Sequence, residues 1–335
     1  MQLDKYILST REALISYIPT DGPREHLYDL VPKYPLRGGK GFRPGLCMAT
    51  CGAFGGNPRA AQQSAVALEL FHNAFLVHDD IEDGSESRRG EPTLHESEGI
   101  PVALNVGDAM NVLSMRPLME NIYVLGPKLT YRVMEEVEHM VRETVEGQAM
   151  ELGWVRDNIC DIGDDDYLRM ILKKTCWYTC IHPCRIGALI GTGGEYNPQN
   201  LDLFGYYLGA SFQIQDDLLN LVGEEEKYGK EIGGDIWEGK RTLMLAHLLR
   251  ETNSSEYERL KTFLDKPRRA RDSNSVEWVY RMMDKYGCIE YGRSCARQLA
   301  GAALREYHVR FAPLPSSDEK QAIEDLVMYM VERDL

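Results

Sequence analysis

The spacing of apolar residues limits the folds open to this sequence more than any other feature. Apolar residues recur with a helical period of 3.6 along nearly the whole chain. The segments are 3–18, 23–31, 44–54, 58–83, 101–125, 129–155, 165–191, 199–222, 241–251, 255–264, 274–286, 287–311 and 317–333. No segment alternates as a β-strand does, and glycine and proline fall mostly between segments. The sequence predicts one all-α domain over residues 1–335, folded as a helical bundle.

Composition and charge exclude some classes of function. Of the 335 residues, 43% are apolar, which suffices for one large core. The chain carries 52 acidic and 38 basic residues, a net charge of −14. Because no basic stripe is present to replace the counterions of nucleic acid, we expect no nucleic-acid partner. An acidic chain can instead bind anions through a metal ion held by carboxylates.

The location of the protein is predicted from what the sequence does not contain. The N-terminal residues lack the basic flank and apolar core of a signal peptide. No run of about 18 apolar residues is present, so we expect no transmembrane segment. These features together predict a cytoplasmic protein.

A first acidic motif ends the segment 58–83. Asp79, Asp80 and Asp83 lie three, four and seven residues after Leu76, so they share one face of the predicted helix. Acids on an inward face repel one another unless a cation neutralises them, and Mg²⁺ prefers such oxygen ligands. Arg88 and Arg89 follow, with donors suited to phosphate oxygens. Taken alone, the motif fits a solvated acidic helix end equally well.

A second acidic motif repeats this arrangement more than a hundred residues later. Gln213, Asp216, Asp217 and Asn220 have the same helical spacing, on a helix whose other side is apolar. Two acid-bearing helices indicate a shared metal cluster between facing helices of a bundle. Lysines follow this motif, as arginines follow the first, at Lys230 and Lys240.

These motifs resemble those of the trans-isoprenyl diphosphate synthases, the polyprenyl synthetase family, over roughly residues 36–250. The segment GGKGFRP at residues 38–44 resembles the family's GGKxxRP loop, and Lys174, Thr175 and Tyr178 match its KTxxY segment. The resemblance implies an isoprenoid synthase-type helical bundle around a deep central cavity. It also implies a homodimer.

The resemblance implies a role for each matching residue. The isopentenyl diphosphate site would comprise Lys40, Arg43, His72 and Arg89. The allylic diphosphate site would comprise Arg88, Lys174, Thr175, Tyr178, Gln213, Lys230 and Lys240. Three Mg²⁺ ions would be held by Asp79, Asp83 and Asp216, with Asp80, Asp217 and Asn220 in support. The catalytic set would be Asp79, Asp80, Asp83, Arg88, Lys174, Asp216 and Lys230.

Two positions depart from the family pattern. Asn220 stands where the second motif usually has a third aspartate, which puts direct metal ligation by this residue in doubt. Met244 replaces a proline common after the EGKxTL element, a change that concerns the start of a helix more than any chemistry.

The implied reaction is a Mg²⁺-dependent condensation. An allylic diphosphate ionises, and the carbocation alkylates isopentenyl diphosphate by 1′-4 coupling. Cations placed around the departing diphosphate stabilise the transition state more than the ground state. An apolar cavity would keep water from the cation. No side-chain nucleophile is needed.

The length of the product is predicted from the residues one turn before Asp79. Ala74 is small and Phe75 is bulky, and both are expected to form the floor of the cavity that receives the growing chain. In the family, aromatic residues at this place shorten the product. One small and one large residue predict a product of intermediate length, geranylgeranyl (C20) or farnesyl (C15) diphosphate.

Several alternatives remain open. A class I terpene cyclase has the same fold, but it has no use for the isopentenyl site formed by Lys40, Arg43, His72 and Arg89. A longer-chain polyprenyl diphosphate synthase would differ only in its cavity. A non-catalytic subunit of a heteromeric synthase would lack an intact first motif, and a metal-dependent phosphohydrolase would show His–Asp pairs.

Overall fold

The computed structural model describes residues 3–39, 41–223 and 233–332, and the long helices are those that the periodicity predicts. They are α1 (Asp4–Ser16), α3 (Phe42–Ala53), α4 (Gln62–Asp83), α6 (Ile100–Glu120), α7 (Ile122–Arg156), α10 (Asp202–Val222), α16 (Cys288–Arg310) and α17 (Asp318–Glu332). The sequence placed a boundary within residues 125–129. The axis of α7 does break there, at Gly126 with φ 73°, followed by Pro127, which cannot donate a backbone hydrogen bond.

Shorter helices join the long ones. They are the π-helix η1 (Arg24–Tyr28), α2 (Lys33–Leu36), η2 (Pro58–Ala61), α5 (Leu94–Glu98), α8 (Asp164–Ile171), the π-helix η3 (Leu172–Ile181), α9 (His182–Gly191), η4 (Pro198–Leu201), α12 (Gly234–Glu238), α13 (Leu243–Glu251), α14 (Ser254–Leu264), η5 (Arg268–Ala270) and α15 (Ser273–Lys285). Four of them, α2, α5, α12 and η5, lie outside the segments for which the sequence predicted a helix. Each is about one turn long, too short to show a helical period.

A small hairpin follows α4 and contains the only strands among the described residues. Strands β1 (Ser87–Arg88) and β2 (Glu91–Pro92) pair antiparallel, with Ser87 opposite Pro92 and Arg88 opposite Glu91. Arg89 and Gly90 form the two-residue turn, with φ of 56° and 77°. Positive φ at both positions is the requirement of the tight hairpin turn whose twist matches the strands. Two-residue strands leave no alternation for the sequence to reveal.

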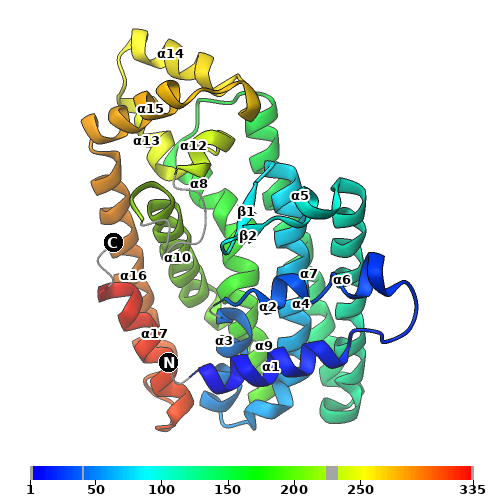
Figure 1. Cartoon of the computed structure of the whole chain (residues 1–335). Coiled ribbons are helices and arrows are strands. Elements are labelled where there is room, and N and C mark those ends of the chain that lie inside the picture. Colours follow the sequence, from blue (N-terminus) through cyan, green and yellow to red (C-terminus); the bar gives the residue numbers. More distant parts are fainter. Residues whose placement is uncertain (1–2, 40, 224–232, 333–335) are drawn as a thin grey trace.

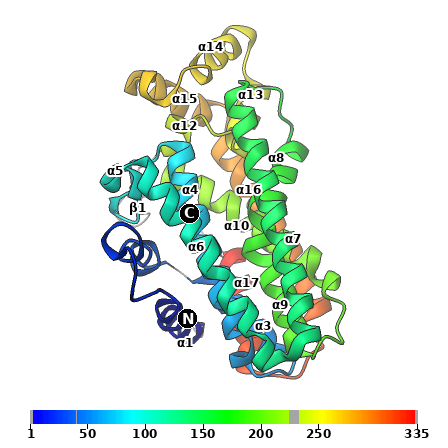
Figure 2. The same cartoon turned by 90° about the vertical axis from the view of Figure 1, so that its right-hand side faces the viewer.

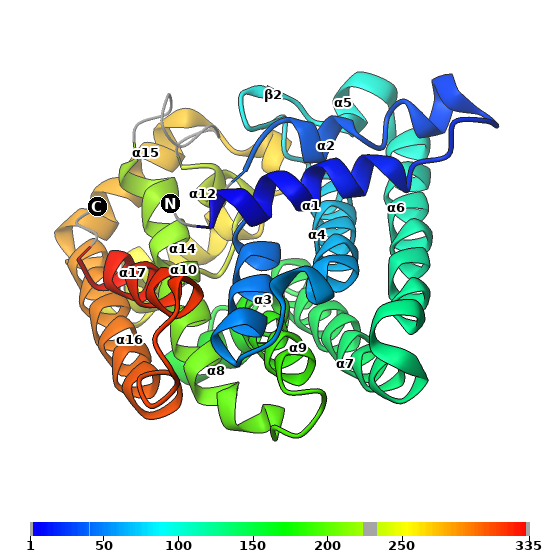
Figure 3. The ribbon, with the colours of Figure 1, turned by 90° about the horizontal axis from the view of Figure 1, so that it is seen from below.

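The bundle has two sides, and α4 and α10, which carry the two acidic motifs, belong to opposite sides. Viewed from below, α4, α6 and α7 form one side and α10, α16 and α17 the other (Figure 3). Helix α4 packs on α6 and α3, whereas α10 packs on α16 and η3. Helices α12 to α15 gather at one end of the bundle, away from α1 (Figures 1 and 2).

The hydrophobic core holds these helices in place. One cluster of buried residues joins α3, α4, α9, α10, α16 and α17, and a second joins α8, η3, α10 and α13 to α16. Burial at this scale fixes the directions of α4 and α10, because interlocked side chains leave little freedom to slide. Within the described residues, none of the helices has the length and apolar character needed to cross a membrane.

Candidate active site

A cavity of about 1490 Å³ lies between α4, α6, α7, η3 and α10. One part is apolar and is lined by Phe71, Phe75, Leu118, Val137 and Val141. The other part is polar. Thirteen of the residues predicted to form the site line the cavity: Arg43, His72, Phe75, Asp79, Arg88, Arg89, Lys174, Thr175, Tyr178, Gln213, Asp216, Asp217 and Lys240. Lys40 and Lys230 lie outside the described residues.

The first acidic motif divides into residues with different surroundings. Asp79 faces the cavity, where its Oδ1 lies 3.1 Å from Nζ of Lys174 and accepts a hydrogen bond from Gln148 at 3.3 Å. Asp80 is fully buried and does not line the cavity. Its carboxylate accepts two hydrogen bonds from Nε of Arg88, at 2.7 and 2.9 Å. Asp80 therefore orients the guanidinium of Arg88 instead of facing the cavity.

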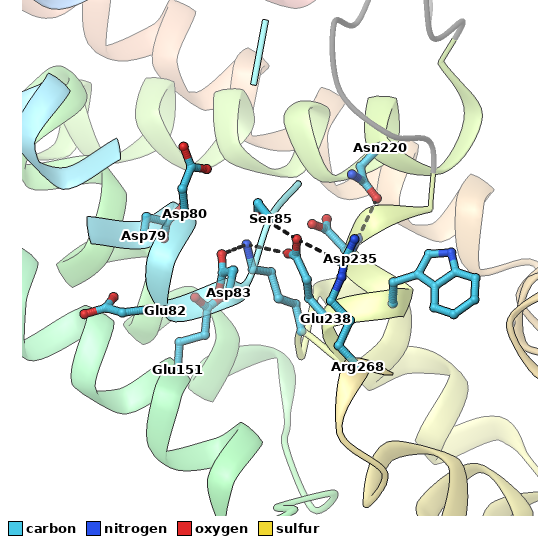
Figure 4. Close-up of polar contacts among 12 residues, drawn as sticks. Asp79, Asp80, Glu82, Asp83, Ser85, Glu151, Asn220, Asp235, Glu238 and Arg268 are labelled. Atoms are coloured by element: carbon cyan, nitrogen blue, oxygen red, sulfur yellow. Dashed lines mark hydrogen bonds and ion pairs between the residues drawn. The ribbon is translucent and has the colours of Figure 1, made fainter. Parts of the chain in front are cut away.

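Asp83, the last acid of this motif, lies in an ionic chain that joins α4 to α12 (Figure 4). Its Oδ2 is 2.6 Å from Nζ of Lys240, which is 3.1 Å from Glu238. Glu238 also accepts hydrogen bonds from Ser85 at 2.9 Å and Arg268 at 3.2 Å. Burial raises the pKa of Asp83 to about 7, although Lys240 acts in the opposite direction.

In the second acidic motif, Asp216 and Asp217 both line the cavity. Asp217 accepts hydrogen bonds from the hydroxyl of Tyr167 and from Nε2 of Gln213, each at 2.7 Å. Burial raises the pKa of Asp217 to about 7, while these two hydrogen bonds act to lower it. Gln213 in turn accepts a hydrogen bond from the hydroxyl of Thr175 at 3.0 Å, so η3 and α10 are tied together beside Asp216.

Asn220 accepts hydrogen bonds from the backbone of residues 233 and 235, so its side-chain oxygen is not free to bind a ligand. Its Oδ1 accepts a hydrogen bond from the backbone N–H of Asp235 at 3.0 Å, and its carbonyl oxygen accepts one from Gly233 at 2.6 Å (Figure 4). The side chain is buried and does not line the cavity, so its expected support of a metal is not direct. Asp235, which this bond places, does line the cavity.

Cationic and aromatic residues also line the polar part of the cavity. Nη2 of Arg43 donates to Thr179 at 2.9 Å, and its guanidinium lies 4.3 Å from the centre of the Tyr178 ring. His72 stacks on the same tyrosine, with the two ring centres 5.9 Å apart. Burial, followed by the charges of Arg43 and Arg89, lowers the pKa of His72 well below its usual value. Its Nδ1 has no hydrogen-bond partner among the described residues, which fits a site built for an anion.

Arg89 is held by backbone carbonyls. Its Nη1 donates to the carbonyl oxygens of Gly38 and Tyr34, the latter at 3.3 Å. A Cβ at Gly39 would lie 2.8 Å from Nη2 of Arg89, and the φ of Gly39 is 131°. The glycines of the GGKGFRP segment therefore allow this loop to pass directly against the arginine.

The π-helix η3 brings Lys174 between two acids. Lys174 pairs with Asp79 of α4 and with Glu151 of α7. Burial alone would lower the pKa of Lys174, but the charges of Asp79 and Glu151 outweigh it and raise the pKa. A Cβ at Gly147 would lie 2.2 Å from the backbone nitrogen of Lys174, so only glycine allows α7 to approach η3 this closely. Irregular helical turns of this kind are common at functional sites.

The two residues predicted to set the product length differ in position. Phe75 lines the apolar part of the cavity, with ring centres 6.3 Å from Phe71 and 5.8 Å from Tyr178. Ala74 does not line it, contrary to expectation: its side chain is fully buried in a cluster with Val106 and Met110 of α6. Neighbouring residues of a helix point in different directions, so only one of the pair faces the cavity.

Sequence reasoning missed four residues that contact predicted site residues: Tyr34, Glu151, Tyr167 and Glu238. Glu151 gave a usable signal, because it is an acid that continues the buried face of α7 formed by Val137, Met140, Thr144 and Gly147. Tyr34 and Tyr167 gave none. Their hydroxyls meet carboxylates that are distant in sequence, and one sequence does not report such pairs.

The site is suited to divalent cations by its chemistry. Its acids offer only oxygen ligands, as Mg²⁺ and Ca²⁺ require. Within the part of the chain that the structure describes, no three acidic, histidine or cysteine side chains converge as a ready-made metal centre. Lys174 and Lys240 lie beside Asp79 and Asp83 instead. Buried carboxylates need a positive partner, and here lysines supply it.

Carboxylates for cations, guanidinium and ammonium groups for phosphate oxygens, and an apolar cavity together define an enzyme for diphosphates with apolar tails. The family model for polyprenyl synthetase matches residues 24–283, and the chain belongs to this family of prenyl-transferring enzymes. A short chain isoprenyl diphosphate synthase from Methanothermobacter thermautotrophicus is 32% identical over 319 residues, covering 93% of this chain and 94% of the relative.

Solved structures agree with the fold. A geranylgeranyl pyrophosphate synthetase from Pyrococcus horikoshii matches with a TM-score of 0.86 and 32% identity, over 99% of this chain and 97% of its own. A geranylgeranyl pyrophosphate synthase from Corynebacterium glutamicum, complexed with isoprenyl diphosphate and magnesium, matches with a TM-score of 0.85 and 25% identity over 99% of each chain. The predicted isoprenoid synthase-type all-α bundle is confirmed.

Proposed function

We propose that this enzyme condenses isopentenyl diphosphate with an allylic diphosphate, in a Mg²⁺-dependent reaction, and releases a short-chain product. The observation that carries the proposal is the position of acids from both motifs, Asp79, Asp216 and Asp217, around one cavity. Lys174, Lys240 and Arg88 line the same polar part, and the remainder of the cavity is apolar. The names of the relatives described above support a short chain. Geranylgeranyl diphosphate is the favoured product, with farnesyl diphosphate the shorter alternative.

The allylic diphosphate would lie between the two acidic motifs. Asp79, Asp83 and Asp216 would hold the metal, for which we propose three Mg²⁺ ions. When bound, Mg²⁺ supplies Lewis acidity and neutralises charge on the departing diphosphate. Arg88, Lys174 and Lys240 would donate hydrogen bonds to the same oxygens, and we propose the same role for Lys230. Their positive charges are placed before the reaction, so they stabilise the developing pyrophosphate without reorganisation.

Isopentenyl diphosphate would bind at Arg43, His72 and Arg89, together with Lys40. Thr179 and Tyr178 hold Arg43, and backbone carbonyls hold Arg89, so both guanidinium groups are oriented before substrate arrives. This preorganisation aligns the double bond of one substrate with the cation of the other. These residues also argue against a terpene cyclase, which takes a single diphosphate substrate.

The exposed face of α6 supports a homodimer. Leu104, Val112, Met115 and Met119 are apolar and 43–71% exposed on this helix. Contiguous apolar residues on a protein surface commonly mark an interaction site. We propose that two copies of the chain associate through this face. A single domain and a cytoplasmic location remain predictions of the sequence.

Turnover of isopentenyl diphosphate tests the proposal. The purified chain is incubated with dimethylallyl, geranyl or farnesyl diphosphate, with and without Mg²⁺, and the dephosphorylated products are separated by chromatography. Mg²⁺-dependent formation of C15 or C20 alcohol is expected. A chain of C40 or longer would refute the assigned length. A hydrocarbon formed from geranylgeranyl diphosphate alone, with no use of isopentenyl diphosphate, would identify a cyclase.

A further inference from the structure

Two buried tyrosines outside the predicted site contact the two acidic motifs in the same way. The hydroxyl of Tyr34, in α2, donates to Oδ2 of Asp80 at 2.5 Å. The hydroxyl of Tyr167, in α8, donates to Oδ2 of Asp217 at 2.7 Å. Both tyrosines are 1% exposed or less. Asp80 and Asp217 are the second aspartates of their motifs, so the same position is bonded by a tyrosine in each.

The other oxygen of each second aspartate is occupied as well. Oδ1 of Asp80 accepts from Nε of Arg88 at 2.7 Å and from Nη2 of Arg88 at 2.5 Å. Oδ1 of Asp217 accepts from Gln213 at 2.7 Å. A buried carboxylate with both oxygens bonded inside the protein is held in one orientation, and freeing it for a metal would break several charge-assisted hydrogen bonds.

The first aspartate of each motif, Asp79 or Asp216, has different surroundings. Asp79 and Asp216 both line the cavity. The pairing of Asp79 with Lys174 joins two side chains that are each about one-fifth exposed, at 3.1 Å. A divalent cation can replace an ammonium group there without leaving a buried hydroxyl unpaired. The tyrosines therefore hold the second aspartates in fixed orientations beside the side chains that they support, although Asp217, unlike Asp80, also lines the cavity.

Tyr34 also touches the second diphosphate site. Its backbone carbonyl accepts a hydrogen bond from Nη1 of Arg89 at 3.3 Å. One residue thus supports Arg88, through its hydroxyl and Asp80, and Arg89, through its backbone. Replacing the side chain removes the first connection and keeps the second.

From these contacts we infer that Tyr34 and Tyr167 are positioning residues for the proposed reaction. Tyr34 fixes Asp80 so that Arg88 points into the allylic diphosphate site. Tyr167 fixes Asp217, which with Gln213 and Thr175 holds η3 against α10. Asp80 and Asp217 act as supports, not as metal ligands. This inference rests on the proposed function for its kinetic test, but it also has a binding test that does not.

Phenylalanine variants provide the kinetic test, because they remove only the hydroxyl. Tyr307→Phe is the matched control: this tyrosine is equally buried, and its hydroxyl donates to Glu324 at 3.2 Å, outside the cavity. Tyr34→Phe is expected to lower kcat about tenfold, the usual effect of losing a hydrogen bond to a charged group. The KM for isopentenyl diphosphate should change less than twofold. Tyr167→Phe should also lower kcat, and Tyr307→Phe should not.

A double-mutant cycle separates positioning from a general loss of stability. In an Arg88→Lys background the lysine cannot keep the forked contact with Asp80, so Tyr34→Phe should change kcat less than twofold. Retention of the full tenfold effect in that background would overturn the inference for Tyr34. An equal loss of kcat in Tyr307→Phe, or a lowered melting temperature with unchanged kcat in both site variants, would overturn it for the pair.

Calorimetric binding of inorganic pyrophosphate with Mg²⁺ gives a readout that needs no turnover. The Kd should rise about tenfold in Tyr34→Phe and stay unchanged in Tyr307→Phe. Unchanged binding in Tyr34→Phe would refute the inference. A wild-type chain that binds pyrophosphate but never consumes isopentenyl diphosphate would instead refute the proposed function and leave the role of Tyr34 to be judged by binding.

Discussion

Asp79 and Asp80 are neighbours in sequence, yet they lie in different surroundings. Consecutive residues of a helix are turned by about 100°, so two adjacent acids seldom face the same space. Asp79 meets the cavity, and Asp80 meets Arg88 in the protein interior. The spacing of the motif gives the general direction of its acids. Which acid is open to a ligand is decided by residues elsewhere in the chain.

Ala74 and Phe75 are also adjacent on α4 and point in different directions. This difference leads to a prediction about product length. Phe75→Ala should lengthen the product by one or more C5 units, because the ring that narrows the apolar cavity beside Phe71 is removed. Product lengths are measured by chromatography after dephosphorylation. Ala74→Ser is the control, since this side chain packs on α6 outside the cavity, and it should leave the distribution unchanged. An unaltered distribution in Phe75→Ala would show that another residue sets the length.

At the scale of single residues, most side chains that the sequence predicted for the site line one cavity, and their roles remain predictions. The two acidic motifs carry a helical spacing, and the GGKGFRP segment carries a family resemblance. Ala74 was wrongly placed at the cavity, because one turn of a helix was treated as one face. Tyr34 was missed, because it lies 46 residues from Asp80 and its hydroxyl meets that acid only after folding.

At the scale of elements, a buried polar group joins α7 to α9. Nδ1 of His182 lies 2.9 Å from Glu136, which is 2.7 Å from Nε of Arg185. Nε2 of His182 lies 3.0 Å from Nδ1 of His139. Burial lowers the pKa of His182 to about 4, although Glu136 acts to raise it. His139 lies 43 residues from His182 and on another helix, so one sequence does not reveal this contact.

This pKa predicts a dependence of stability on pH. The pKa of His182 in the folded chain, about 4, is below that of an unfolded histidine, about 6.5. Between these values the unfolded chain binds more protons, so stability is retained above about pH 6.5 and lost as the pH falls toward 4. His182→Gln does not titrate. It should reduce the difference in unfolding free energy between pH 7 and pH 5 by about 2 kcal/mol.

Urea unfolding at the two pH values measures this difference. His26→Gln is the control, because His26 is exposed and its replacement should leave the difference unchanged. If His182→Gln shows the same difference as the wild type, the histidine does not lower stability in acid.

Long helices were predicted more accurately than short helices and strands. Helices such as α4 and α10 show their period over five or more turns, and their ends were placed within a few residues. The short helices α2 and α12 and the hairpin after α4 contain too few residues for any period. They are formed by contacts with the rest of the chain, such as the bond from Asn220 to the backbone of Asp235.

At the scale of the whole molecule, the bundle brings two distant motifs to one cavity and places lysines beside two acids of the first motif. Removing divalent ions with EDTA should therefore abolish turnover and leave the fold intact, because Lys174 and Lys240 already balance Asp79 and Asp83. Activity and circular dichroism are measured before and after chelation, and activity should return with added Mg²⁺. Loss of helical signal on chelation would contradict this account, since the acids would then need metal to fold.

The exposed face of α6 predicts how the chain assembles. Val112→Glu places a charge on a residue that is 71% exposed, and it should convert a dimer to a monomer in size-exclusion chromatography with light scattering. Burying an unpaired carboxylate in an apolar interface is unfavourable. Leu8→Glu, on the exposed side of α1, should leave the mass unchanged. A wild-type chain that elutes as a monomer would contradict the proposed dimer.

The hairpin after α4 also bears on how sequences of this kind can vary. Its turn contains two residues, and the strands on either side contain two each. Side chains alternate along a strand, so inserting or deleting one residue here would turn Arg88 away from Asp80. Substitutions at exposed positions of this hairpin should be tolerated, whereas insertions and deletions should not. Natural variants should therefore differ in composition at the exposed Glu91 and Pro92 while keeping the same number of residues between Ser87 and Pro92.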